Sequence, residues 1–199
     1  MATEIYFDGF EVEEVGGSKT PPGDYHTQIV DVKPDGGRNG QMVVTFEIVG
    51  GTNPAAIGRH HVENFPTDVK SWAQKKKAAV AFASGIVTIE QAKEAKAKGE
   101  PLAPQWENMV GKQVCISIGE SKDGRFANIN FDNIWSPTDR RAVHIPLNAG
   151  MLAAGGIVLP ADRPVGGIPK DAKAAAKTKN ADKPAAAPPP VDNLLSGVV

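Results

Sequence analysis

The stretch QIVDVKPDGGRNGQMVVTFEIVGG, residues 28–51, places two runs rich in β-branched residues on either side of a loop with three glycines. In the second run, every second residue from Met42 to Ile48 is large and apolar, which is the period of a strand with one buried face. The first run predicts a strand from Tyr25 to Lys33. The seven-residue loop between them is longer than a tight two-residue turn. Together they predict a hairpin with an adaptable tip that carries one arginine.

Further along, the chain changes period twice. RHHVENF, from Arg59 to Phe65, predicts a short third strand. From Asp68 to Ser84 the apolar residues recur at three-and-four spacing, which predicts an amphipathic helix. Thr88 and Gln91 fit a capping box that opens a second helix, and its Ala, Lys and Glu composition predicts that it is solvated.

Two further alternating runs, QVCISIGE and FANINFDNIW, flank the turn SKDGR and predict a second hairpin. The order is therefore three strands, a helical segment and two strands. This is the order of a five-stranded OB barrel, in which a helix closes one end. We predict a mainly β fold: an OB-like barrel with a helical insertion between strands 3 and 4. A half-barrel or a sandwich of the same strands also fits the pattern.

The chain beyond this core lacks clear periodicity. After Pro137 the apolar residues are scattered, and they could pack on the barrel or on a partner subunit in a homo-oligomer. The last segment is dominated by Ala, Lys and Pro, which predicts disorder, and it ends in the apolar tip VDNLLSGVV. The predicted parts are an acidic lead (1–20), the OB-fold domain (21–136), an irregular extension (137–168) and a disordered tail (169–199).

Charge and cysteine content narrow the possible function classes. The formal net charge is −1, which permits an anionic partner without demanding one. Residues 1–14 carry five acids and no Lys or Arg. The single cysteine, Cys115, excludes an internal disulfide. The start of the chain has no apolar signal segment, and no apolar run approaches eighteen residues. These features predict a cytoplasmic protein that does not enter a membrane.

Enzymatic interpretations find little support. The alternation puts Cys115 on the polar side of its strand, without an evident basic neighbour to lower the pKa of its thiol. P-loop, nucleophile-elbow and HExxH motifs are absent from the sequence. His61 and Glu63 share one strand face and could hold a metal ion, but polar contacts are favoured because no third ligand is close in sequence. We predict no catalysis, no cofactor and no metal.

A binding surface is a better interpretation. OB barrels bind oligomers on the outer face of strands two and three, between the loops that join strands 1–2 and 4–5. Here both loops combine glycine with cations, although an ordinary polar hairpin tip would look similar. Phe126, next to Arg125 on the polar face of its strand, could stack on a base. The candidate nucleic-acid-binding residues are Lys33, Arg38, Arg59, His60, Lys122, Arg125 and Phe126.

Several stretches of the sequence resemble phage-encoded OB-fold proteins that are regarded as single-stranded DNA-binding proteins. Among these stretches are PPGDYHTQIVDVK, MVVTFEIVGG, GRHHVENF, AAVAFASGI and MVGKQVCISIG. The likeness runs from Ile5 to Trp135. It implies a non-catalytic protein of phage DNA replication or recombination in the host cytoplasm. Its partner would be single-stranded DNA, with replication or recombination proteins reached through the C-terminal tail. The alternative is a protein-interaction or virion-associated module that uses the C-terminal tip.

Overall fold

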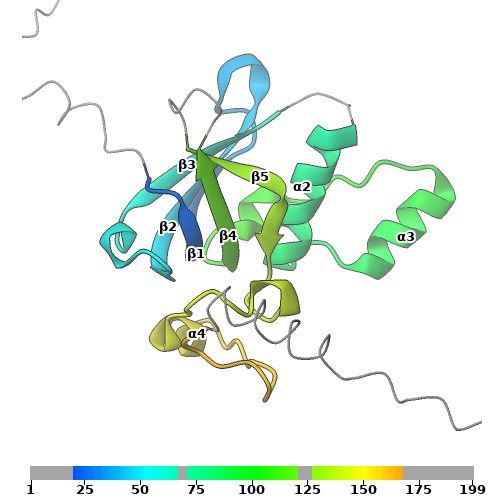
Figure 1. Ribbon diagram of the computed structural model, residues 1–199. Helices are drawn as coiled ribbons and strands as arrows, with labels where there is room; N and C mark the ends of the chain where they lie inside the picture. Colours follow the sequence, from blue (N-terminus) through cyan, green and yellow to red (C-terminus); the bar gives the residue numbers. More distant parts are fainter. Residues whose placement is uncertain (1–19, 67–70, 121–126, 168–199) are drawn as a thin grey trace, which may run out of the picture. The chain divides into compact units, whose positions relative to one another are not determined.

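A curled antiparallel sheet forms a half-barrel at the centre of the molecule (Figure 1). The computed structural model describes residues 20–66, 71–120 and 127–167. Neighbouring strands in the sheet follow the order β3-β2-β1-β4-β5. This confirms a mainly β fold built on one curled sheet. The strands are β1 (Gly23–Lys33), β2 (Met42–Gly51), β3 (His60–Phe65), β4 (Gln113–Glu120) and β5 (Ala127–Trp135).

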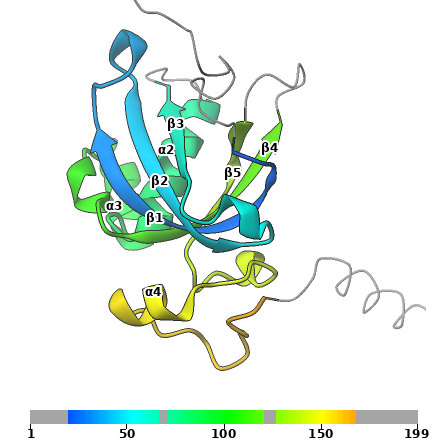
Figure 2. The same cartoon turned by 90° about the vertical axis from the view of Figure 1, so that its left-hand side faces the viewer.

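The curl of the sheet comes from β1. This strand pairs with β2 along most of its length and with β4 over its first half. Its register against β2 shifts between His26 and Thr27 and again between Ile29 and Asp31, and such bulges bend a strand and increase its twist. Figure 2 shows the result: both ends of β1 lie toward the top of the view, where β4 ends and β5 begins.

The concave face of the sheet holds the main core. The predicted alternation in β2 is confirmed, since its even-numbered residues from Met42 to Ile48 are all buried. Tyr25 and Ile29 from β1 and Val114 and Ile116 from β4 are fully buried in the same cluster. The side chains of Trp72 and Phe131 lie outside the described residues.

Two helices follow β3 in the chain. Helix α2 (Ser71–Ser84) contacts β3, β4 and β5 and contributes Val80 and Ala83 to the core. Helix α3 (Ile89–Lys98) has the predicted capping box, in which the Thr88 hydroxyl accepts from the Gln91 amide and the Gln91 side chain accepts from the Thr88 amide. No described residue of α3 is buried, which confirms that this helix is solvated. Short 3₁₀ helices are η1 (Arg38–Gly40), η2 (Pro54–Ala56), η3 (Trp106–Met109) and η4 (Arg140–Ala142).

The segment after β5 folds back against the convex side of β1 and β4. It contains η4 and α4 (Ala149–Ala154) and packs its apolar residues around Cys115 and Trp135. Gly50 allows a close approach, because a side chain there would come within 3.1 Å of the Pro146 carbonyl and 3.2 Å of the Asn148 amide. We refer to described residues 137–167 as the extension. Its buried apolar residues are Ala142, Ile145, Leu147 and Leu152.

Hydrogen bonds fasten the extension to the sheet. The backbone amide of Asn148 donates to Nδ1 of His26 (3.0 Å), so Nε2 of that ring carries the proton and donates to Oε1 of Gln113 (3.0 Å). Gln113 in turn donates to the Met151 carbonyl. Arg163, itself buried, donates to the Ala142 carbonyl (2.8 Å). The buried side chains of His26 and Gln113 thus find hydrogen-bond partners in the extension.

Candidate nucleic-acid interface

The convex face of β2 and β3 is an open surface. Antiparallel pairing sets the outward residues in three cross-strand pairs, and those of β3 are all exposed. Val62 is the most unusual among them, because 54% of its surface is accessible. The extension does not supply any of the contacts described for these six residues. We call them the outer wall: Val43 with Asn64, Thr45 with Val62, and Glu47 with His60.

The candidate cations that are described lie at the two ends of this wall. Lys33 and the backbone of Arg38 belong to the β1–β2 hairpin, next to the start of β2. Arg59 and His60 lie at the start of β3, where His60 pairs with Glu47. Five residues of extended strand separate these ends, which corresponds to about 17 Å. The structure therefore brings the candidates together in two groups and not in one cluster.

The hairpin tip has a defined backbone. Asn39 and Gly40 both adopt left-handed conformations, with φ of 58° and 68°, which asparagine and glycine accept more readily than other residues. The Gly37 amide donates to the Gln41 carbonyl (2.9 Å) and closes the loop. The Lys33 side chain is exposed and lies 3.3 Å from a carboxylate oxygen of Asp31. Solvent screening keeps this contact weak, so the lysine can exchange it for a phosphate.

The second predicted loop cannot be placed on this surface. Lys122, Arg125 and Phe126 lie outside the described residues, and so does the side chain of Arg38. The strands on either side of that loop, β4 and β5, end and begin at the same side of the sheet as the β1–β2 hairpin (Figure 2). The roles assigned to these residues therefore stay predictions.

Sequence reasoning missed the middle of the wall. Positive charge and aromatic rings mark the two ends of the wall, and neither feature marks Thr45, Val62 or Asn64. The sequence does contain a signal for two of them, because strand alternation from the outward His60 places Val62 and Asn64 on the same face. The wall also carries the carboxylate of Glu47, which repels phosphates. Cations act at the ends of the surface, while its middle offers van der Waals contact and neutral hydrogen bonds.

His61 and Glu63 share the inner face of β3, as predicted, and Glu63 has His61 and a lysine as partners. Nε2 of His61 lies 3.1 Å from Oε2 of Glu63, and Lys76 from α2 donates to Oε1. The backbone amide of Ile129 in β5 also donates to Oε2 (3.0 Å). Glu63 thus connects β3, α2 and β5 where the sheet has its two edges. The described residues contain no group of three His, Cys, Asp or Glu side chains suited to a metal.

This buried cluster keeps its carboxylate ionised. Burial by itself raises the pKa of Glu63, but the hydrogen bond from His61 and the charge and hydrogen bond of Lys76 outweigh it, so the pKa lies below its usual value. Lys76 is buried, because Glu63 gives its ammonium group a partner inside the fold.

The thiol of Cys115 is unsuited to nucleophilic chemistry. The residue points to the convex side of β4, as the alternation predicts, but the extension covers it completely. Burial raises the pKa of Cys115 to about 12, although the nearby Arg163 acts in the opposite direction. A thiol with this pKa is protonated at neutral pH and reacts slowly.

Comparisons with known proteins do not assign this chain to a family: neither a protein-family model nor a curated protein sequence matches it. Within the described part of the chain, every helix is too short or too polar to span a lipid bilayer.

Proposed function

We propose that this protein binds single-stranded DNA without catalysis and without strong sequence preference, and that its half-barrel is an OB-like fold with the helical segment inserted between strands 3 and 4. The observation that carries the proposal is the uncovered outer wall, with cationic residues at both ends. The chain covers the convex face of β1 and β4 with its own extension. It leaves open the face that OB folds use for oligomers.

The binding mode follows from the chemistry of the wall. A strand lying along β2 and β3 would place phosphates near Lys33 and Arg38 at one end and near Arg59 and His60 at the other. The span of about 17 Å, or about three nucleotides of an extended strand, would lie over Val62 and its polar neighbours. Lys122, Arg125 and Phe126 would close over the strand from the loop between β4 and β5, with Phe126 as the stacking residue.

The resemblance to phage-encoded OB-fold proteins supports a role in phage DNA replication or recombination. Such a protein would work in the host cytoplasm, and its C-terminal tail could contact replication or recombination proteins. Affinity that comes from neutralised phosphates falls steeply with salt, with a logarithmic slope of about −0.7 per contacted phosphate for single strands.

The experiment is a fluorescence anisotropy titration of labelled oligo-dT with the full chain at low and moderate salt. Reversing Arg38 and Arg125 to Glu together should weaken binding about tenfold or more. Reversing Lys93 and Lys98 to Glu is the matched control, because both lie on the solvated helix α3, and it should have little effect. Equal losses in the two variants would show that the interface is misplaced. Undetectable binding by the unaltered chain would refute the proposal.

A protein-interaction module is the second candidate function, and the composition of the wall is the observation that favours it. Glu47 and the exposed Val62 suit a protein partner at least as well as a polyanion. In that case the chain would fail to bind oligo-dT, and partner binding would depend on the tip VDNLLSGVV. Binding of DNA that survives removal of residues 168–199 would decide for the first candidate.

A further inference from the structure

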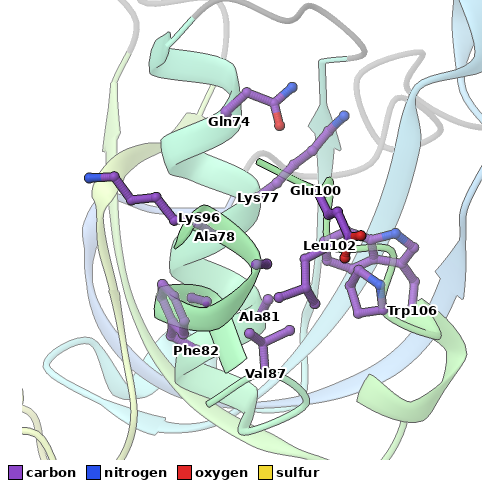
Figure 3. Close-up of a pocket in the computed structure, with 13 residues that line it drawn as sticks. Gln74, Lys77, Ala78, Ala81, Phe82, Val87, Lys96, Glu100, Leu102 and Trp106 are labelled. Atoms are coloured by element: carbon purple, nitrogen blue, oxygen red, sulfur yellow. The ribbon is translucent and has the colours of Figure 1, made fainter. Parts of the chain in front are cut away.

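A second surface lies away from the outer wall, between α2, α3 and the segment that leads to η3 (Figure 3). It is a cavity of about 340 Å³. Ala92 and Ala95 of α3 line it, and their side chains are too short to fill the space between two helices. Its apolar lining includes Ala81, Phe82, Val87, Leu102 and Trp106. We call it the helical groove.

The groove leaves large apolar side chains in contact with water. Phe82 is 40% exposed and Leu102 is 41% exposed, and covering such surface is favourable. Lysines stand on its rim: Figure 3 shows the amino groups of Lys77 and Lys96 pointing outward on either side of α2. One carboxylate, Glu100, also lines it. This combination suits an acidic segment that carries aromatic or aliphatic side chains.

We propose that the helical groove binds the acidic N-terminal segment of a second copy of this chain. Residues 4–14, EIYFDGFEVEE, carry five acids and no Lys or Arg. The same stretch supplies Ile5, Tyr6, Phe7 and Phe10 as apolar anchors. The C-terminal segment fits less well, because residues 166–199 carry five lysines against three aspartates and the rim lysines would repel it.

Reach favours a second copy over the same chain. The described chain begins at Thr20, next to β1, and Figures 1 and 2 both place the start of β1 on the opposite side of the sheet from α3. Ten residues, from Phe10 to Thr20, span at most about 35 Å when fully extended, and to reach the groove of the same copy they would have to run around the sheet. Docking between copies needs no such path and would produce head-to-tail association.

The test uses a labelled peptide with the sequence of residues 2–14 and the full chain in which Tyr6, Phe7 and Phe10 are changed to Ser, so that the groove is not occupied by its own segment. The peptide should bind this protein, and a peptide with the same three serines should not. Lys77→Glu together with Lys96→Glu should weaken peptide binding about tenfold. The matched control, Lys93→Glu together with Lys98→Glu, should change it less than about twofold, because neither residue lines the groove.

Association of the full chain is the second readout. Sedimentation of the unaltered protein should show concentration-dependent association that is lost in the Tyr6, Phe7 and Phe10 variant. A peptide whose five acids are replaced by lysines should bind the Lys77→Glu, Lys96→Glu protein better than it binds the unaltered groove. This rescue would show that the lysines act by charge and not through folding.

Several results would overturn the inference. Absence of saturable peptide binding at about 500 µM protein would exclude a useful affinity. Equal binding by the groove variant and its control would place the peptide elsewhere. Displacement of the peptide by oligo-dT would place it on the outer wall. The unaltered chain could also stay monomeric in sedimentation while its own N-terminal segment competes with the added peptide for the groove. This result would show that the segment comes from the same copy, and it would refute a second copy as donor. The peptide titration, its variants and the sedimentation do not depend on whether the protein binds DNA.

Discussion

Two regions of the convex face of the sheet differ in what covers them: we call the region over β1 and β4 the covered face, and the region over β2 and β3 is the outer wall. On β1 and β4 the outward residues His26, Gln113 and Cys115 are buried beneath the extension. On β2 and β3 the six residues of the outer wall remain partly or fully exposed. Both faces are made of mostly polar residues in alternating strands, so polarity does not tell which of the two is covered. The contacts of a segment far away in the chain decide it.

The covered face shows what burial demands of polar side chains. His26, Gln113, Asn148 and Met151 form a continuous chain of hydrogen bonds, and Nε2 of His144 lies 3.3 Å from a carboxylate oxygen of Asp24. A buried polar group without a partner would cost on the order of 1–3 kcal/mol. The outer wall has no such requirement, because water satisfies its polar groups. This difference makes it available to a ligand.

The largest expected effect concerns the thiol on the covered face. At pH 8 a thiol with a pKa of about 12 has roughly a thousandfold less thiolate than one with the ordinary value of 9. Native Cys115 should therefore react with iodoacetamide about a thousand times more slowly than in the denatured chain. The rate is measurable without ambiguity, because the chain has one cysteine. Fast native labelling would show that the extension is not closed over β4.

A cavity on the covered face should cost more than the same change on the outer wall. Ile145→Ala removes side-chain volume from a fully buried site and should lower the free energy of unfolding by about 3 kcal/mol. Val62→Ala, at an exposed site, should change it by less than about 0.5 kcal/mol. Urea denaturation of the two variants measures this contrast directly. Equal losses would mean that the two faces are covered to the same degree.

Acid should loosen the covered face. Burial lowers the pKa of His26 from 6.5 to about 4. The unfolded chain therefore binds a proton more readily than the folded protein, so stability present above pH 6.5 is lost as the pH falls toward 4. The loss should reach about 2–3 kcal/mol. Denaturation at several pH values measures it.

The control for this pH dependence is a pair of histidine variants. His26→Gln should reduce the loss of stability between about pH 6.5 and 4.5, because it removes the buried ring that takes up the proton. His60→Gln, at an exposed position on the outer wall, should leave the profile unchanged. Glu63 contributes at lower pH, since its pKa is below the usual 4.5 and its stabilisation fades only as the pH falls through that lowered pKa. An unchanged profile in His26→Gln would contradict the hydrogen bonding described for that ring.

Local sequence rules predicted the elements well. Alternation located the inner face of β2, and Thr88 with Gln91 marked the start of α3, since both signals depend on neighbours a few residues away. Sequence also placed His61 and Glu63 on one face. It did not find their partner, because Lys76 and Ile129 reach Glu63 only after β3, α2 and β5 have come together.

The candidate interface stays a prediction. Lys33, the backbone of Arg38, Arg59 and His60 lie at the ends of one open face, whereas Val62 and Glu47 in its middle are neither cationic nor aromatic, so charge and rings did not mark them. The alternation of apolar and polar residues by itself determined which strands form and which side of each faces the core. Only the tertiary structure decided which convex face stays open. Covering a face requires the extension to bring complementary apolar surface and hydrogen-bond partners, and periodicity within a strand carries no record of contacts with residues far away in the chain.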